Sequence, residues 1–301
     1  YGARASYIGG AIGTSNTLAG KMFDIPALGT MAHSWVQFFD SEYEAFKAYA
    51  ETYPENCNLL IDTYDVLKEG LPNAIKVFDE IVVPSGHRPT GVRIDSGDIA
   101  YLSKQIRKTL DAHGYEDVKI MVSNSLDEKI IKSLLDQGAQ IDSFGVGERL
   151  ITAKSDPVFG GVYKLVAVEK DGEIIPKIKI SENVEKITTP GFKQVYRFYS
   201  NKDGAPLADL VCLHDEKYEN TDSVEIFHPN FTWKRRTLTD YQAVKMLKRI
   251  YKDGKLVYKL PSLDQIKEKS EKSVARLWEE QKRLEYPHEY YVDLSLDLWT
   301  L

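Results

Sequence analysis

Short apolar segments alternate with amphipathic helical patterns through the first half of the chain, and this alternation limits the fold more than any other feature. Strands separated by helices are typical of βα units, whose strands pair in parallel within one sheet. The alternation therefore predicts an α/β domain. The expected strands are 27–31, 58–61, 91–94, 119–122, 143–146 and a less regular one at 162–168.

Local signals mark the ends of the helices between these strands. Ser41 and Ser125 each begin a pattern typical of a capping box, in which side chains bind the free N–H groups of the first helical turn. Pro54, Gly114 and Gly138 follow the helical patterns at positions where helix-ending residues are expected.

The number of βα units bears on the architecture. Five or six such units favour an irregular β/α barrel over an open, flavodoxin-like sheet, which is the alternative. Both folds place ligands at the carboxyl ends of their strands. We expect residues 1–165 to form the barrel and to be the catalytic domain.

The pattern changes after residue 165. The strands predicted there are 177–180, 194–199 and 208–213. Residues 201–204 have the composition of a hairpin turn, and helices are expected after the capping residues Thr239 and Ser262. Residues 166–301 are therefore predicted to form a smaller α+β subdomain that packs on the barrel.

Composition and charge restrict the class of protein. The 301 residues are 43% hydrophobic, enough for a large core, and the net charge of −6 argues against a dedicated nucleic-acid binder. Cys57 and Cys212 are far apart and support neither a zinc site nor a disulfide framework, which favours a reducing cytoplasm. No apolar run approaches the ~20 residues that cross a bilayer, so no membrane partner is expected.

His33 stands directly after the first predicted strand, and Asp62 and Asp65 follow the next one. A carboxylate there could hold one imidazole nitrogen and leave the other as a nucleophile or base. The alternative is a hydrogen-bonded histidine with a structural role only, which is the commoner case for a lone His.

Arg93 and Asp95 form the strongest chemical pattern. Because they are two residues apart on a predicted strand, their side chains point to the same face. Arg binds phosphate oxygens in a bidentate manner, and Asp accepts hydrogen bonds from sugar hydroxyls or holds Mg²⁺. The pattern predicts a phosphate or sugar site, and a buried ion pair of structural value is the alternative.

Small residues at two further places are compatible with anion binding. Thr14 and Ser15 precede a helix and offer hydroxyls and free N–H groups, although an ordinary N-cap is the simpler explanation. Gly145 and Gly147 lie at the end of a predicted strand, where glycine lets the backbone approach a phosphate closely.

Six segments taken together resemble one family. They are GTSN at 13–16, GTMAHSW at 29–35, DTYD at 62–65, RIDSGD at 93–98, SNSLDE at 123–128 and FGVGERL at 144–150, with HPNFTWKRR at 228–236 nearer the end. Their order and spacing are similar to those of nicotinate phosphoribosyltransferase over most of the chain. The combination is specific, whereas no single motif is.

The resemblance implies a type II phosphoribosyltransferase fold, in which an irregular α/β barrel lies beside a second domain, usually in a homodimer with active sites at the subunit interface. It also implies the reaction, in which nicotinate and phosphoribosyl pyrophosphate give nicotinate mononucleotide and pyrophosphate in NAD biosynthesis. ATP is then a co-substrate that acts through a phosphorylated histidine. That histidine matches His33, and the Asp that orients it matches Asp65.

The same matching implies roles for the other candidates. Arg93 would contact nicotinate, and Asp95 would contact the ribose. The 5′-phosphate would lie among Ser123, Asn124, Gly145 and Gly147. Mg²⁺ is expected with the pyrophosphate, and no residue is assigned as a metal ligand.

Ser15, beside Thr14, bears on the choice of substrate. Related nicotinamide-using enzymes carry an Asp at this position, which accepts a hydrogen bond from an amide but repels a carboxylate. A Ser at a helix start donates to a carboxylate, which favours nicotinate. The alternatives are nicotinamide phosphoribosyltransferase and, from another class, a non-catalytic ligand-binding relative.

The first residue is Tyr1 rather than Met, and the sequence begins within a helical pattern. We therefore expect an N-terminal domain to be missing. In the family that part supplies aromatic residues that sandwich the pyridine ring, so this stretch alone is expected to bind substrates poorly.

Overall fold

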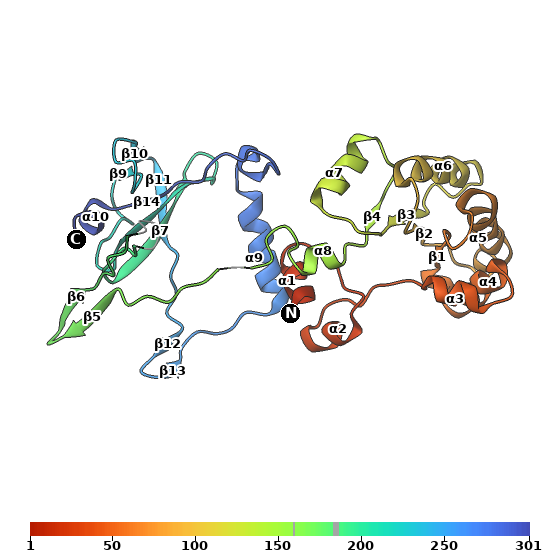
Figure 1. The fold of residues 1–301 in the computed structure, drawn as a ribbon, viewed down its shortest axis with the longest axis horizontal. Coiled ribbons are helices and arrows are strands. Elements are labelled where there is room, and N and C mark those ends of the chain that lie inside the picture. Colours follow the sequence, from red (N-terminus) through yellow and green to blue (C-terminus); the bar gives the residue numbers. More distant parts are fainter. Residues whose placement is uncertain (159, 183–186) are drawn as a thin grey trace. The chain divides into compact units, whose positions relative to one another are not determined.

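A computed structural model describes residues 1–158, 160–182 and 187–301 (Figure 1). The chain divides into two compact units, Tyr1–Phe159 and Gly160–Leu301. The first unit contains the parallel strands and the helices between them, and the second is mainly antiparallel. The chain is therefore a mixed α/β protein.

A parallel sheet forms the centre of the first unit. Its strands are β1 (Asn58–Leu60), β2 (Gly91–Ile94), β3 (Lys119–Val122) and β4 (Ser143–Phe144), hydrogen-bonded in that order. Apolar side chains on both faces explain the strands, because a sheet covered by helices on its two sides is buried throughout. The strands predicted at 58–61, 91–94, 119–122 and 143–146 are confirmed.

Helices connect and surround these strands. They are α1 (Gly2–Ile8), α2 (Thr17–Phe23), α3 (His33–Phe38), α4 (Glu42–Thr52), η1 (Pro54–Asn56), η2 (Val66–Gly70), α5 (Leu71–Val77), η3 (Phe78–Val82), α6 (Ile99–Ala112), α7 (Glu128–Asp136) and α8 (Glu148–Ile151). Helices α3 to α6 lie around β1 to β3 (Figure 1). They bury one continuous core, in which Phe46, Leu59, Phe78, Ile94 and Ile106 are fully inaccessible to solvent.

Most of the predicted helix ends are observed. The Ser41 hydroxyl accepts a hydrogen bond from the Glu44 N–H at 3.3 Å, and Gly114 and Gly138 follow their helices with φ of +77° and +72°. The predicted cap at Ser125 is wrong. Asp127 caps α7 instead and accepts from the Ile130 N–H at 2.8 Å, because its carboxylate is the stronger acceptor.

Two predicted strands of the first half are absent from the described residues. Residues 27–31 form a loop with one isolated bridge between Thr14 and Ala27, and at 162–168 only the last two residues enter a strand. The four described parallel strands pair in the order β1-β2-β3-β4, and the closure of an irregular β/α barrel stays a prediction. Of the apolar side chains in 27–31, Met31 is buried in the core, whereas Ala27 and Leu28 are exposed.

The second unit contains one large sheet. Its order is β10 (Arg235–Thr239), β9 (Ser223–Phe227), β14 (Val292–Leu294), β8 (Pro206–Leu213), β7 (Lys193–Ser200) and β11 (Tyr241–Lys245). The smaller elements are β5 (Ala167–Lys170), β6 (Glu173–Pro176), β12 (Tyr251–Lys252), β13 (Lys255–Leu256), α9 (Leu263–Ala275), η5 (Glu279–Lys282) and α10 (Leu296–Thr300). The predicted strands at 194–199 and 208–213 and the turn between them are confirmed.

Asp240 alone links β10 to β11, although these strands form opposite edges of the six-stranded sheet. The two edges therefore meet at Asp240, and the sheet must curl. Asp240 makes the corner with a left-handed backbone, at φ of +53°, and its carboxylate accepts a hydrogen bond from the Asn201 amide at 3.0 Å. Tyr196, Phe198 and Leu210 are fully buried in the core of this sheet.

Asp240 also explains a wrong prediction. A helix was expected after Thr239, but β11 follows, because Leu238 and the residues of β11 continue the alternation of a sheet across the corner. Residues 177–180, expected to be a strand, have no regular structure. The helix expected after Ser262 is confirmed as α9, and its capping box with Gln265 is complete.

None of the helices in the described ranges has the length and apolar character needed to cross a membrane.

Gly70 offers a test of the packing between η2 and β1. A Cβ atom at this position would lie 1.9 Å from the Ile61 carbonyl oxygen, which is backbone and has little freedom to move. Gly70→Ala should therefore lower the free energy of unfolding by about 3 kcal/mol, measured by urea denaturation. Gly9→Ala is the control, since its Cβ would make only ordinary contacts at 3.4 Å. Equal stability of both variants would contradict the close approach.

Glu42 allows a test by pH. Burial raises the pKa of its carboxyl above 4.5, nearby Glu69 and Asp62 raise it further, and a hydrogen bond from Asn73 opposes the shift. The folded state thus keeps a proton that the unfolded chain releases, so this group lowers stability as pH rises from 4.5 through the raised pKa.

Glu42→Gln should therefore be more stable than the parent protein at pH 7, and the gain should vanish below pH 4.5. Urea denaturation at several pH values measures it. Glu44→Gln, exposed on the same helix, serves as the control and should show no such pH-dependent gain. A gain that is independent of pH would contradict the raised pKa.

Candidate active site

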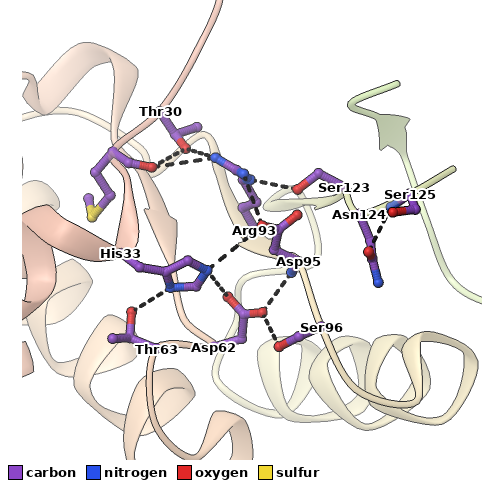
Figure 2. Close-up of polar contacts among 11 residues, drawn as sticks. Thr30, His33, Asp62, Thr63, Arg93, Asp95, Ser96, Ser123, Asn124 and Ser125 are labelled. Carbon is purple, nitrogen blue, oxygen red and sulfur yellow. Dashed lines mark hydrogen bonds and ion pairs between the residues drawn. The ribbon is translucent and has the colours of Figure 1, made fainter. Parts of the chain in front are cut away.

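A cluster of polar side chains lies where the strands β1, β2 and β3 end (Figure 2). The carboxyl ends of parallel strands meet at one edge of a sheet, so residues far apart in sequence come together there. Asp62 follows β1, Arg93 and Asp95 lie at the end of β2, and Ser123 follows β3. His33 enters from the first turn of α3.

His33 is accessible and surrounded by polar atoms. Its Nδ1 lies 3.0 Å from the Thr63 hydroxyl, and its Nε2 lies 3.8 Å from both Asp62 Oδ1 and Asp95 Oδ2. The side chain is 39% exposed, so a substrate can reach the imidazole. A neutral ring that donates from Nδ1 to Thr63 keeps the Nε2 lone pair for a proton or an electrophile.

Asp62 is the most buried charged group of the cluster, with a side chain only 1% exposed. Its Oδ2 accepts hydrogen bonds from the Asp95 N–H at 2.8 Å and from the Ser96 hydroxyl at 2.7 Å. Its Oδ1 has no hydrogen-bond partner among the described residues and lies on the His33 side. A buried carboxylate with one free oxygen favours a positive or proton-donating group nearby.

Asp65 requires a correction. It was expected to orient His33, but its carboxylate caps η2, where it accepts from the Leu67 and Lys68 N–H groups at 3.1 and 3.0 Å. These bonds hold the pKa of Asp65 below its usual value. The groups beside the imidazole are instead Thr63 and Asp62. Asp65 serves the helix start because it directly precedes the free N–H groups.

Arg93 crosses the cluster from β2. Its Nε donates to the Ser123 hydroxyl at 2.8 Å, and its Nη1 donates to the Thr30 hydroxyl at 3.1 Å and the Met31 carbonyl at 3.4 Å. Its Nη2 lies 3.6 Å from Asp95 Oδ2, which is an ion pair and not a hydrogen bond. Asp95 therefore lies between the positive guanidinium and the imidazole of His33.

A hollow of about 360 Å³ adjoins this cluster. It is lined by Asp95, Ser123, Asn124, Ser125, Leu126, Gly145, Gly147, Glu148 and Arg149. A Cβ at Gly145 would crowd Met121 and Ser123 at 3.2 and 3.3 Å, whereas a Cβ at Gly147 would enter open space. Gly145 thus permits close packing of β3 and β4, and Gly147 leaves the backbone accessible.

Asn124 has a strained backbone, with φ of +121°. Few residues other than glycine adopt this region, and such strain is concentrated at functional sites. The Asn124 carbonyl side-chain oxygen accepts from the Ser125 N–H at 2.6 Å, which stabilises the turn after β3. The turn brings polar backbone and side chains to the wall of the hollow.

Arg149 is a residue of the hollow that the sequence interpretation did not select. Its Nη1 binds Asp127, and together with the Ile130 N–H it holds the pKa of the Asp127 carboxyl below its usual value. Its Nε is buried and has no partner among the described residues. The sequence feature that could have identified Arg149 is its position two residues after Gly147, in the segment that follows β4.

Thr14 and Ser15 lie apart from this hydrogen-bond network. Thr14 accepts from the Asn16 N–H at 3.0 Å, and Asn16 caps α2 by accepting from the Ala19 N–H. Within the described part of the chain, neither Thr14 nor Ser15 hydrogen-bonds to His33 or Arg93. The structure thus brings together the other predicted site residues, Asp65 excepted, and assigns the capping role to Asn16.

The assembled site has defined chemical capacities. Accessible imidazole nitrogen can accept a proton or a phosphoryl group, carboxylate oxygens can bind hydroxyls or a hard cation, and two guanidinium groups can bind anions. The hollow beside them offers hydroxyl and amide groups. This combination suits a substrate with both phosphate and sugar groups.

Sequence comparison identifies relatives along the whole chain. Residues 192–301 match the family described as the nicotinate phosphoribosyltransferase C-terminal domain. A Bacillus subtilis nicotinate phosphoribosyltransferase is 46% identical over 302 residues, covering 100% of this chain and 61% of the relative. A human nicotinate phosphoribosyltransferase is 32% identical over 98% of this chain and 64% of its own length.

The structure also resembles solved ones. The crystal structure of human nicotinic acid phosphoribosyltransferase superimposes with a TM-score of 0.78 at 29% identity, covering 99% of this chain and 65% of that one. A nicotinate-nucleotide pyrophosphorylase from Pyrococcus furiosus shares the fold, with a TM-score of 0.58 at 24% identity.

The chain thus spans about three fifths of the length of the relatives that it matches. The sequence similarity and the structural similarity both extend along the whole chain. The chain is similar to nicotinate phosphoribosyltransferases over its whole length, and its residues 192–301 match the C-terminal domain of that family.

Proposed function

We propose that this chain supplies the catalytic core of a nicotinate phosphoribosyltransferase, which makes nicotinate mononucleotide in NAD biosynthesis. The observation that carries the proposal is the position of His33. Its Nδ1 is bound to Thr63, and its Nε2 lies between Asp62 and Asp95 at an edge lined by anion-binding groups. The substrates are inferred from the names of the similar proteins.

In the proposed transfer, the pyridine nitrogen of nicotinate forms a bond to the anomeric carbon of phosphoribosyl pyrophosphate. The bond from that carbon to the pyrophosphate oxygen breaks, and pyrophosphate leaves with the electron pair. The transition state is cationic at the sugar, so the enzyme works mainly by orientation and charge stabilisation. Asp95 would accept hydrogen bonds from the ribose, and Arg93 would bind the nicotinate carboxylate.

The hollow would hold the 5′-phosphate. Gly147 leaves its N–H accessible, and Ser123, Asn124 and Ser125 add hydroxyl and amide donors. Arg149 is paired with Asp127, but its buried Nε has no acceptor among the described residues and could donate to the phosphate. Gly145 keeps the wall close to β3.

ATP is the proposed second energy source. The lone pair of His33 Nε2 would attack the γ-phosphorus of ATP and release ADP, and later hydrolysis of the phosphohistidine would give phosphate. In the tautomer whose Nδ1 donates to the Thr63 hydroxyl, the Nε2 lone pair would be free for this attack. The added charge of about −1.5 to −2 would change the affinity for the substrates at the same edge.

Mg²⁺ fits the residues present. Asp95 and the free Oδ1 of Asp62 are hard oxygen donors, and Mg²⁺ commonly uses one or two carboxylates together with substrate phosphates. Among the described residues no group of three or more acidic, His or Cys side chains is arranged to hold a metal alone. When bound, the ion would offset the charge of the pyrophosphate.

We also propose the remaining family features for the whole protein. The parallel strands β1–β4 would be part of an irregular β/α barrel, and the protein would act as a homodimer in the cytoplasm. The four-stranded sheet covered by helices and the likeness to the human structure support this proposal. Ser15 at the start of α2 favours nicotinate over nicotinamide.

His33→Ala in the complete protein should abolish the stimulation by ATP and leave a slow, ATP-independent transfer, because the proposed phosphate acceptor is lost while Arg93 and Asp95 remain. The measurement is the rate of nicotinate mononucleotide formation with and without ATP. A competition between nicotinate and nicotinamide in the parent protein tests the choice of substrate. His113→Ala, directly after α6, provides the control, since His113 lies outside the site. Full ATP stimulation in the His33 variant would refute its role.

The corrected partner of His33 can be tested with a matched pair of variants. Asp62→Asn should lower the ATP-coupled rate about 100-fold, because it removes the buried negative charge beside the imidazole. Asp65→Asn should retain both rate and stability, since Asn caps helices nearly as well as Asp. The reverse order of effects in the same assay would restore Asp65 as the orienting residue.

A further inference from the structure

Thr30 and Arg93 form a contact that the proposed chemistry does not yet use (Figure 2). The Arg93 Nη1 donates to the Thr30 hydroxyl at 3.1 Å and to the Met31 carbonyl at 3.4 Å. Thr30 in turn donates its hydroxyl hydrogen to the Met31 carbonyl at 3.2 Å. The lone pairs of the Thr30 oxygen are therefore left to accept from the guanidinium.

This contact holds the segment that leads to His33. Residues 28–32 have no regular structure, and Ala32 at the N-cap of α3 makes no side-chain hydrogen bond to the helix start. The side-chain hydrogen bond that usually fixes the start of a helix is thus missing. Arg93 on β2 holds the segment instead, through Thr30, which lies three residues before His33.

The contact also orients the guanidinium itself. Ser123 accepts from Nε, and Thr30 and Met31 accept from Nη1. Two of the three guanidinium nitrogens thus donate hydrogen bonds to the protein. The Nη2 lies beside Asp95 at 3.6 Å and makes no hydrogen bond within the described residues. Its N–H groups are the ones that an anionic ligand can engage.

We propose that Thr30 is a positioning residue for the anionic substrate. It acts through Arg93, by holding the guanidinium so that Nη2 is presented to the carboxylate of nicotinate. This inference rests on the proposed function. Without the Thr30 hydroxyl, Nη1 keeps only the longer contact of 3.4 Å to the Met31 carbonyl, so the guanidinium is held less tightly.

The decisive experiment compares four variants of the complete protein: Thr30→Val, Thr30→Ser, Arg93→Lys and the double variant Thr30→Val/Arg93→Lys. Valine keeps the shape of threonine and removes the acceptor. Thr30→Val should raise KM for nicotinate about tenfold with little change in kcat, since a hydrogen bond to a charged group is lost. Thr30→Ser retains the hydroxyl and should restore KM.

The double variant separates positioning from a merely structural role. Lysine cannot make the fork of hydrogen bonds that Arg93 makes. If Thr30 acts through Arg93, the double variant should bind nicotinate no worse than Arg93→Lys alone. Additive losses in KM, an unchanged KM in Thr30→Val, or a fall in kcat at constant KM each overturn the inference.

Thr90→Val supplies the matched control. It is the same chemical change just before β2, at the end of the strand opposite the site, and the Thr90 hydroxyl oxygen has no hydrogen-bond partner among the described residues. Its KM and kcat should equal those of the parent protein. An equal rise in KM in this variant would attribute the Thr30 effect to a general loss of packing.

A second measurement separates this inference from the proposed function. Failure of the parent protein to form nicotinate mononucleotide would reject the function. Urea denaturation of the parent protein, Thr30→Val, Arg93→Lys and the double variant then measures the coupling between Thr30 and Arg93 directly. A coupling of about tenfold in the unfolding equilibrium constant supports the positioning of Arg93 by Thr30, and zero coupling overturns it.

Discussion

The site depends on the buried carboxylate of Asp62. One of its oxygens accepts from the backbone N–H of Asp95 and from the Ser96 hydroxyl, so it ties the end of β1 to the turn after β2. The other oxygen has no such partner in the described structure and lies on the His33 side. The same side chain thereby fixes the backbone that carries Asp95 and creates a negative environment for the imidazole. Removing only the carboxylate, or only one of its partners, leaves the other group buried and unpaired, which lowers the stability of the fold.

The sequence predicted the parallel sheet well, because each of its strands is a short apolar run with a turn signal after it. The strands at 91–94 and 119–122 were predicted at their observed bounds. Prediction failed where tertiary contacts outweigh local pattern. The segment 27–31 is apolar, but its polar atoms bind Arg93 from β2 instead of a neighbouring strand. At Asp240, one residue in a left-handed conformation joins two sheet edges, and no local pattern announces this corner.

The candidate site shows the same limit. Arg93 and Asp95 were identifiable as functional residue types at a strand end, and His33 as a functional residue type after a short apolar run. The choice between Asp62 and Asp65 could not be made from the sequence. The two carboxylates lie within four residues of each other, and the sequence alone allows either of them to reach a histidine. Only the start of η2 decides between them: its free N–H groups bind Asp65, and Asp62 turns into the sheet edge.

The charges of the site are arranged as exchangeable pairs. Arg93 lies against Asp95 and Arg149 against Asp127, so neither guanidinium is unbalanced before a ligand arrives. An incoming anion would compete with these carboxylates for the guanidinium N–H groups. His33 shares Asp95 with Arg93, and any charge added to the imidazole is therefore felt at the anion-binding edge.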